Sequence, residues 1–252
     1  MIEAVGNIFG GIGARGYFAR DIGRGATSPR TYGPEIIGQM RKMGVDSIPL
    51  VAAVAAFIGA VTAVQTRFQL LPGVELNVVG LITRQSIVLE LGPLLTALVL
   101  TGRVGARITA ELGTMRVTEQ IDALETLAYD PVAYLVVPRL IASIIMVPLL
   151  TIFADSIGIM TGMYAAQSVG VDSATFVEGL RLSFGPFQVV YSLLKATLFG
   201  TAIAFFCAYE GFFAESGAEG VGRSTASAVV VTSVAILMLD ALTAMVLARY
   251  LI

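Results

Sequence analysis

The sequence contains no histidine, no tryptophan and a single cysteine, Cys207. Without histidine, the chain cannot build an ordinary zinc or haem site, a Ser-His-Asp triad or a Cys-His pair, and one cysteine cannot form an internal disulfide. Charged residues make up only 13% of the 252 residues, about half the share found in soluble proteins. We therefore predict no catalytic residue, no metal site and no cofactor bound by this chain.

The sequence also lacks an excess of basic residues and a phosphate-binding loop, and both absences bear on its binding partners. The formal net charge is -2, which gives no electrostatic reason to expect a nucleic-acid partner. The only lysines are Lys42 and Lys195, and neither belongs to a G-x-x-x-x-G-K-[ST] phosphate-binding loop. If ATP drives this protein, ATP and Mg are bound and used by a separate ATPase subunit.

What the sequence does contain is apolar surface. Hydrophobic residues make up 56% of the chain, and the mean hydropathy is +0.83. A helix that crosses the hydrocarbon core needs about 20 apolar residues. Runs that reach about this length, with at most one charge each, cover residues 47–66, 85–102, 140–171, 182–209 and 224–248. We predict an all-α integral membrane protein with about five transmembrane helices.

The basic residues set the orientation, because cytoplasmic loops are enriched in lysine and arginine. Eleven fall on one side of the predicted spans: Arg15, Arg20, Arg24, Arg30, Arg41, Lys42, Arg103, Arg107, Arg116, Arg139 and Arg223. Four fall on the other: Arg67, Arg84, Arg181 and Arg249. The N-terminus is therefore predicted in the cytoplasm and the C-terminus outside it.

Residues 1–46 precede the first predicted span. Ile2, Val5, Phe9 and Ile12 recur at helical spacing and are followed by basic residues, a pattern that favours an amphipathic helix lying in the membrane interface over a flexible basic tail. A second amphipathic segment lies between the second and third spans, where residues 117, 121, 124 and 128 form an apolar stripe. This segment either rests on the membrane surface or docks in a groove of a cytoplasmic partner.

Four of the predicted spans contain one charge each: Glu90, Asp155, Lys195 and Asp240. Each lies 13 to 16 residues from the inner end of its span, roughly 20–24 Å at 1.5 Å per residue, so the four belong to one layer in the outer half of the membrane. A charge at the bilayer centre costs about 2.5–3.5 kcal/mol on insertion scales. Lys195 either pairs with Asp155 or Asp240 only to hold helices together, or the layer is part of a transport path.

Several specific motifs occur along the chain. The longest is AELGTMRVTEQIDALE at residues 110–125. Shorter motifs are ELGP at 90–93, GRVG at 102–105, DP at 130–131, VPR at 137–139 and GVGR at 220–223, with Asp240 downstream. In these motifs the sequence resembles the MlaE/YrbE family, the permease subunits of ABC transporters that work with MCE-domain proteins. The chain departs from the family at Leu89, where an arginine often precedes ELGP.

The resemblance implies a permease domain over residues 47–252 that pairs with a second copy of itself in a bacterial inner membrane. The expected cargo is phospholipid, carried between the inner membrane and periplasmic MCE-domain proteins (MlaD-like) or the outer membrane; relatives handle sterols or fatty acids. ATP is hydrolysed by a cytoplasmic ABC ATPase (MlaF-like) seated on a coupling helix at about 111–127.

The resemblance also assigns roles to individual residues. The implied lipid pathway contains Glu90, Leu91, Leu94, Gln65 and Phe68. The implied contacts with the ATPase are Glu111, Met115, Arg116, Glu119, Ile121, Asp122, Leu124 and Glu125. Two alternatives to a lipid permease are a membrane scaffold for a periplasmic complex and an ion-coupled transporter that uses Asp155, Lys195 and Asp240 as a relay.

Overall fold

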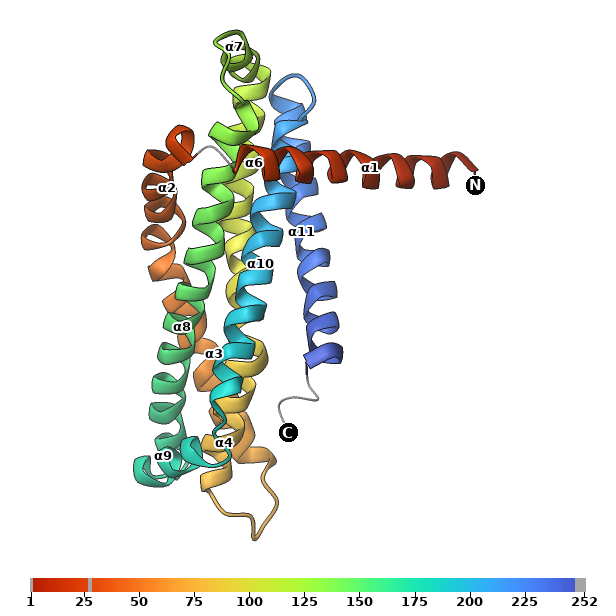
Figure 1. The fold of residues 1–252 in the computed structure, drawn as a ribbon. Helices are drawn as coiled ribbons and strands as arrows, with labels where there is room; N and C mark the ends of the chain where they lie inside the picture. The colour runs from red at the N-terminus through yellow and green to blue at the C-terminus, as the bar shows by residue number, and fades with distance from the viewer. Residues whose placement is uncertain (1, 27–28, 248–252) are drawn as a thin grey trace. The chain divides into compact units, whose positions relative to one another are not determined.

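The computed structural model describes the backbone of residues 2–26 and 29–247, and every regular element in these ranges is a helix (Figure 1). Five helical segments are long and apolar enough to cross a membrane: Gly33–Gln69, Asn77–Val117, Val132–Ser168, Pro186–Phe212 and Ala218–Leu247. Helices satisfy every backbone hydrogen bond within the segment, as hydrocarbon requires. The prediction of an all-α protein with five spans is confirmed.

The segments differ in length from the predicted runs. The second begins at Asn77 rather than residue 85, because polar residues such as Arg84 continue the helix beyond the apolar run. The third ends at Ser168, before a turn in which Gly170 has a φ of +83°. A short helix that the sequence pattern did not predict, α9 (Ser173–Arg181), follows, and the carboxylate of Asp172 caps it by accepting from the Ala174 backbone N–H at 3.0 Å.

The chain divides into two compact units. The first unit contains Met1–Met43, Thr101–Ser143 and Thr201–Val234, and the second contains Gly44–Leu100, Ile144–Gly200 and Ala235–Ile252. The helices of the first unit are α1 (Ile2–Gly25), α2 (Pro29–Met43), α6 (Ala106–Val117) and α7 (Gln120–Thr126). Those of the second are α3 (Ile48–Gln69), α4 (Asn77–Ser86), α5 (Gly92–Leu100) and α9. Both units take parts of α8 (Val137–Ser168), α10 (Pro186–Phe212) and α11 (Ala218–Leu247).

In the first unit, an aromatic cluster attaches α1 to the end of α10. Phe18 is buried, and its ring lies 5.5–5.9 Å from four other aromatic rings, those of Phe205, Tyr209, Phe212 and Phe213. Arg15 adds an ion pair with Glu210 at 3.3 Å. The predicted N-terminal helix is therefore present. Its expected apolar face falls on side chains outside those described, so its place in the membrane interface stays a prediction.

In the second unit, glycines let helices approach closely. Gly80 of α4 faces the Phe176 carbonyl oxygen, and Gly179 of α9 faces that of Asn77, so a Cβ at either glycine would overlap a carbonyl. Figure 1 shows α4 and α9 side by side. Val79 of α4 and Phe176 of α9 belong to an apolar core that also contains Ala63, Ala166 and Val171.

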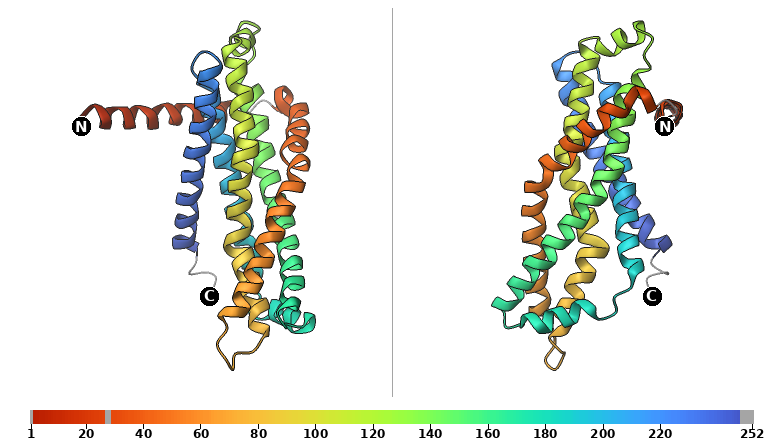
Figure 2. Two further views of the ribbon diagram at one scale, coloured as in Figure 1. Left: turned by 180° about the vertical axis from the view of Figure 1, so that it is seen from behind. Right: turned by 60° about the vertical axis from the view of Figure 1, so that its left-hand side comes forward.

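A second close approach joins α3 to α8, which can be followed in both views of Figure 2. A Cβ at Gly59 would overlap the carbonyl oxygen of Gly158, and one at Gly162 would lie 3.0 Å from that of Gly59. Small residues at such contacts allow the close packing that holds membrane helices together. The Gly158-x-x-x-Gly162 pair thus serves packing within the chain.

We predict that Gly59→Ala destabilises the protein by about 1–3 kcal/mol, because an added methyl group must push two backbones apart. The measurement is the midpoint of thermal unfolding in detergent, followed by far-ultraviolet circular dichroism. Gly222→Ala is the matched control, since a Cβ at this helical glycine would meet no other atom within 4 Å. Equal midpoints for the two variants would contradict the close approach of α3 and α8.

Candidate functional site

Lys195 of α10 is the buried centre of an ion triad in the second unit. Its side chain is 0% exposed, and its Nζ lies 2.6 Å from Oε2 of Glu90 and 2.6 Å from Oδ1 of Asp240. Nζ also donates a hydrogen bond to the carbonyl oxygen of Leu89 at 3.1 Å. We call Glu90, Lys195 and Asp240 the ion triad. It brings together three of the four intramembrane charges that the sequence places at one depth.

The local backbone explains how Glu90 and Leu89 both reach the ammonium. Residues Ile87–Leu91 form a π-helical turn between α4 and α5, and such turns replace the usual backbone bonds by wider i→i+5 bonds and occur often at functional sites. Within this turn the Leu89 carbonyl accepts from Lys195, and the Glu90 carboxylate accepts as well. The turn therefore supplies two ligands to one ammonium from consecutive residues.

Asp155, the fourth intramembrane charge, is not an ion-pair partner of Lys195 in the structure. Its Oδ1 is buried against Gly92, where a Cβ would overlap it. Among the described residues, the structure shows Lys195 paired with Asp240 and Glu90 and not with Asp155. Of the two alternative partners expected for Lys195, Asp155 or Asp240, the structure shows Asp240. Glu90 is a second partner that was not predicted.

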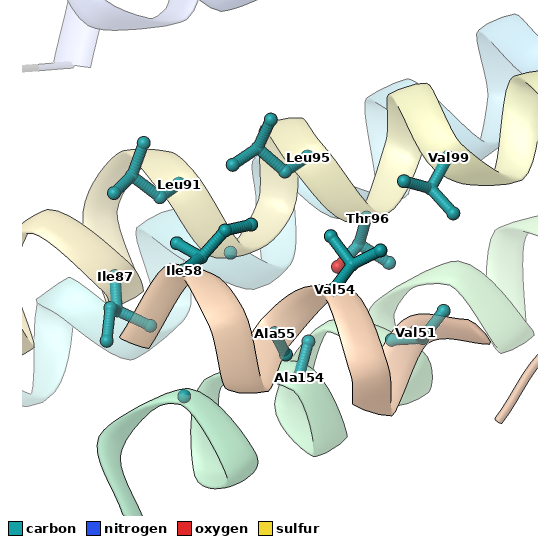
Figure 3. Close-up of a pocket in the computed structure, with 12 residues that line it drawn as sticks. Val51, Val54, Ala55, Ile58, Ile87, Leu91, Leu95, Thr96, Val99 and Ala154 are labelled. Atoms are coloured by element: carbon teal, nitrogen blue, oxygen red, sulfur yellow. The ribbon is translucent and has the colours of Figure 1, made fainter. Parts of the chain in front are cut away.

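The residues predicted to line a lipid pathway do not share one surface in the second unit. Leu91 lines a cavity with residues of α3, α5 and α8 (Figure 3), whose volume of ≈ 20 Å³ is room for about one water molecule. Gln65 and Phe68 line a shallow hollow of ≈ 570 Å³ along α3, and Phe68 is 75% exposed. Leu94 is half-buried and lines neither. Of these two, the α3 hollow is the larger.

The predicted coupling segment at 111–127 consists of two helices rather than one. α6 ends at Val117 and α7 begins at Gln120, because Glu119 adopts a left-handed conformation with φ 58°. Arg116 crosses the break and contacts Asp122 at 2.6 Å. The helical periodicity of the apolar residues runs through this position without interruption, so the sequence pattern gives no signal of the break.

The members of the segment divide into buried and exposed groups. Ile121 is fully buried and so anchors α7 to its own unit, while Leu124 is half-buried. Glu111 is bound by Arg107 at 2.8 Å and by Arg139 at 3.2 Å, and with Met115 it borders a shallow hollow of ≈ 430 Å³. Exposed side chains suited to a partner are Arg116, Glu119, Asp122, Glu125, Leu127 and Tyr129. Leu127 and Tyr129 were not predicted.

Comparison with known proteins identifies the family. The model of the family described as Permease MlaE matches residues 36–246. The chain belongs to the MlaE permease family. A probable ABC transporter permease protein of Rickettsia prowazekii is 42% identical over 211 residues, covering 83% of this chain and 82% of its own.

Two further relatives extend the comparison. The intermembrane phospholipid transport system permease protein MlaE of Haemophilus influenzae is 31% identical over 246 residues, 95% of this chain and 94% of its own. The chloroplastic protein TRIGALACTOSYLDIACYLGLYCEROL 1 of Arabidopsis thaliana is 32% identical over 205 residues, 80% of this chain and 58% of its own. This MlaE permease is therefore the membrane subunit of an ABC transporter.

Arg84 is a residue of this MlaE permease whose role the sequence pattern does not show. It counts as a loop cation in the sequence, yet it is only 4% exposed. It donates to Oε1 of Gln188 at 2.8 Å and to the carbonyl oxygen of Leu182 at 2.9 Å, and its guanidinium lies 5.3 Å from the Phe184 ring. Arg84 thus ties α4 to the connection between α9 and α10, which is a structural role.

For the ion triad, we predict that Lys195→Met lowers stability by about 3 kcal/mol, the lower end for breaking a buried pair because Glu90 is half-exposed. The triple variant Lys195→Met, Glu90→Gln, Asp240→Asn should recover most of the loss, since no charge is then left unpaired. Thermal unfolding midpoints in detergent measure both effects, with Lys42→Met as control. A triple variant no more stable than the single variant would rule out charge pairing as the cause.

Proposed function

We propose that this MlaE permease moves phospholipids between a bacterial inner membrane and acceptors outside it. The half-exposed carboxylate of Glu90 is the observation that carries the proposal. A charge in a membrane-spanning segment that stays reachable is a functional group by default, because its burial in hydrocarbon is costly. A scaffold would need Glu90 only as a partner of Lys195, with no exposed side.

The surface for acyl chains is the apolar face of α3 in the same unit. Phe57, Val61 and Phe68 are all exposed there, and the hollow beside Gln65 and Phe68 follows the same helix. One helix face cannot enclose a lipid. We propose that a second copy of the chain provides the opposite wall, with head groups near Glu90 and acyl chains along α3.

The exposed part of α6, α7 and the turn after them is the proposed seat of the ATPase subunit. Exposed Leu127 and Tyr129 supply apolar contact area, and Glu119, Asp122 and Glu125 supply charges that fix the register. This assignment puts the N-terminus in the cytoplasm and the C-terminus in the periplasm, where an MCE-domain protein receives or delivers the lipid. ATP and Mg belong to the ATPase.

A continuous helical segment carries both proposed sites. The segment Asn77–Val117 contains Glu90 in its first half and Glu111 in its second. Glu111 is held by Arg107 and Arg139, and Arg139 follows the π-helical turn that begins the third spanning segment. We propose that closure of the ATPase subunits shifts this segment and changes the access of lipid to Glu90.

The transport proposal predicts ATP-dependent movement of phospholipid in vesicles that contain the permease with its ATPase and MCE-domain subunits. Glu90→Leu should lower the rate about tenfold, the effect of losing about 1.4 kcal/mol of interaction with the moving head group. The loss of a fluorescent phospholipid from the vesicles measures the rate, and Glu75→Gln is the control. Transport that needs a proton gradient and no ATPase would instead establish the ion-coupled alternative.

The coupling proposal predicts that Glu119→Lys with Asp122→Lys weakens the association with the ATPase while membrane insertion stays intact. Reversed charges would repel the partner and also lose the Arg116 contact of Asp122. Co-purification of the ATPase with tagged permease measures the association, and Glu178→Lys in α9 is the control. Undiminished co-purification of the double variant would place the ATPase elsewhere.

A further inference from the structure

The ammonium of Lys195 is surrounded by oxygen atoms of its own chain. A lysine ammonium has three N–H donors, and three oxygen atoms lie within 3.1 Å of Nζ: Leu89 O, Glu90 Oε2 and Asp240 Oδ1. The Tyr191 ring covers a further side, with its centroid 5.2 Å away. Since the side chain is 0% exposed, a phosphate group cannot reach this cation without displacing one of its carboxylates.

The exposed part of the ion triad carries negative charge. The Glu90 side chain is 45% exposed and that of Asp240 is 18% exposed, and two carboxylates against one ammonium leave one surplus negative charge. Of the other cations that the structure describes in the second unit, Arg84 is occupied by Gln188 and two backbone carbonyls, and Arg67 and Arg181 lie in the last turns of α3 and α9. The residue before Glu90 is uncharged Leu89.

We propose that the ion triad makes this permease select lipids whose head group carries an ammonium, such as phosphatidylethanolamine, over lipids whose head group is anionic, such as phosphatidylglycerol. This inference rests on the proposed function and names its substrate class. An ammonium head group donates hydrogen bonds to the free side of Glu90 and offsets the surplus charge. An anionic head group meets a carboxylate instead of a donor, and the repulsion is strong where water is scarce.

The test uses the transporter purified with the subunits that stay bound to it, in nanodiscs of equimolar phosphatidylethanolamine and phosphatidylglycerol. Native mass spectrometry counts the lipids of each class that remain on the complex. We expect phosphatidylethanolamine to be enriched about threefold, the ratio that one partly exposed ion pair can produce. Glu90→Gln, which keeps the shape and an acceptor for Lys195, should bring the ratio close to the bulk value.

Asp240→Asn is a second, independent variant, because it removes the surplus charge while Glu90 and Lys195 remain paired, and it should also lower the enrichment. Glu75→Gln, a carboxylate outside the triad, should keep the wild-type ratio. Retained lipid at the bulk ratio, enrichment of phosphatidylglycerol, or full enrichment in Glu90→Gln would overturn the inference and leave the proposed function standing. Complexes that retain no lipid of either class would overturn both.

Discussion

Hydrocarbon offers no hydrogen bonds, and this constraint shapes the whole chain. Each spanning segment is helical because its backbone must satisfy itself, and a charge within a segment needs a partner from another helix. The π-helical turn at Ile87–Leu91 departs from the regular α-helical hydrogen-bonding pattern. Lys195 donates a hydrogen bond to the Leu89 carbonyl oxygen within this turn. A buried ammonium thus satisfies a carbonyl group in an irregular stretch of backbone.

The same contact joins structure to function. Lys195 is completely buried because two carboxylates and a carbonyl surround it, and this arrangement leaves Glu90 half-exposed with a surplus negative charge nearby. A group that was needed only for stability would be satisfied on all sides. The ion triad therefore holds the helices of its unit together and still has an exposed charged side, on which the proposed selection of lipids depends.

The sequence places the four intramembrane charges at one depth, but it does not decide which of them contact one another. Counting residues from the ends of the spans gives depth, because every helical residue rises by about 1.5 Å. Depth could not show that Asp155 lies against Gly92 while Glu90 and Asp240 pair with Lys195, since the direction of a side chain around its helix depends on how neighbouring helices are rotated. In the coupling segment, periodicity could not show that Glu119 and Ala128 adopt positive φ or that Ile121 is buried in its own unit.

The sequence by itself determined the class of molecule: five apolar runs, scarce charge and the motif at 110–125 indicate a helical membrane permease. These features are local, because composition and short-range order decide whether a segment is apolar and helical. Only the tertiary structure decided that Lys195 binds Glu90 and Asp240, that Arg84 is a buried clamp, and that Leu127 and Tyr129 are exposed. Those outcomes depend on residues up to about a hundred positions apart, which meet only when the helices pack.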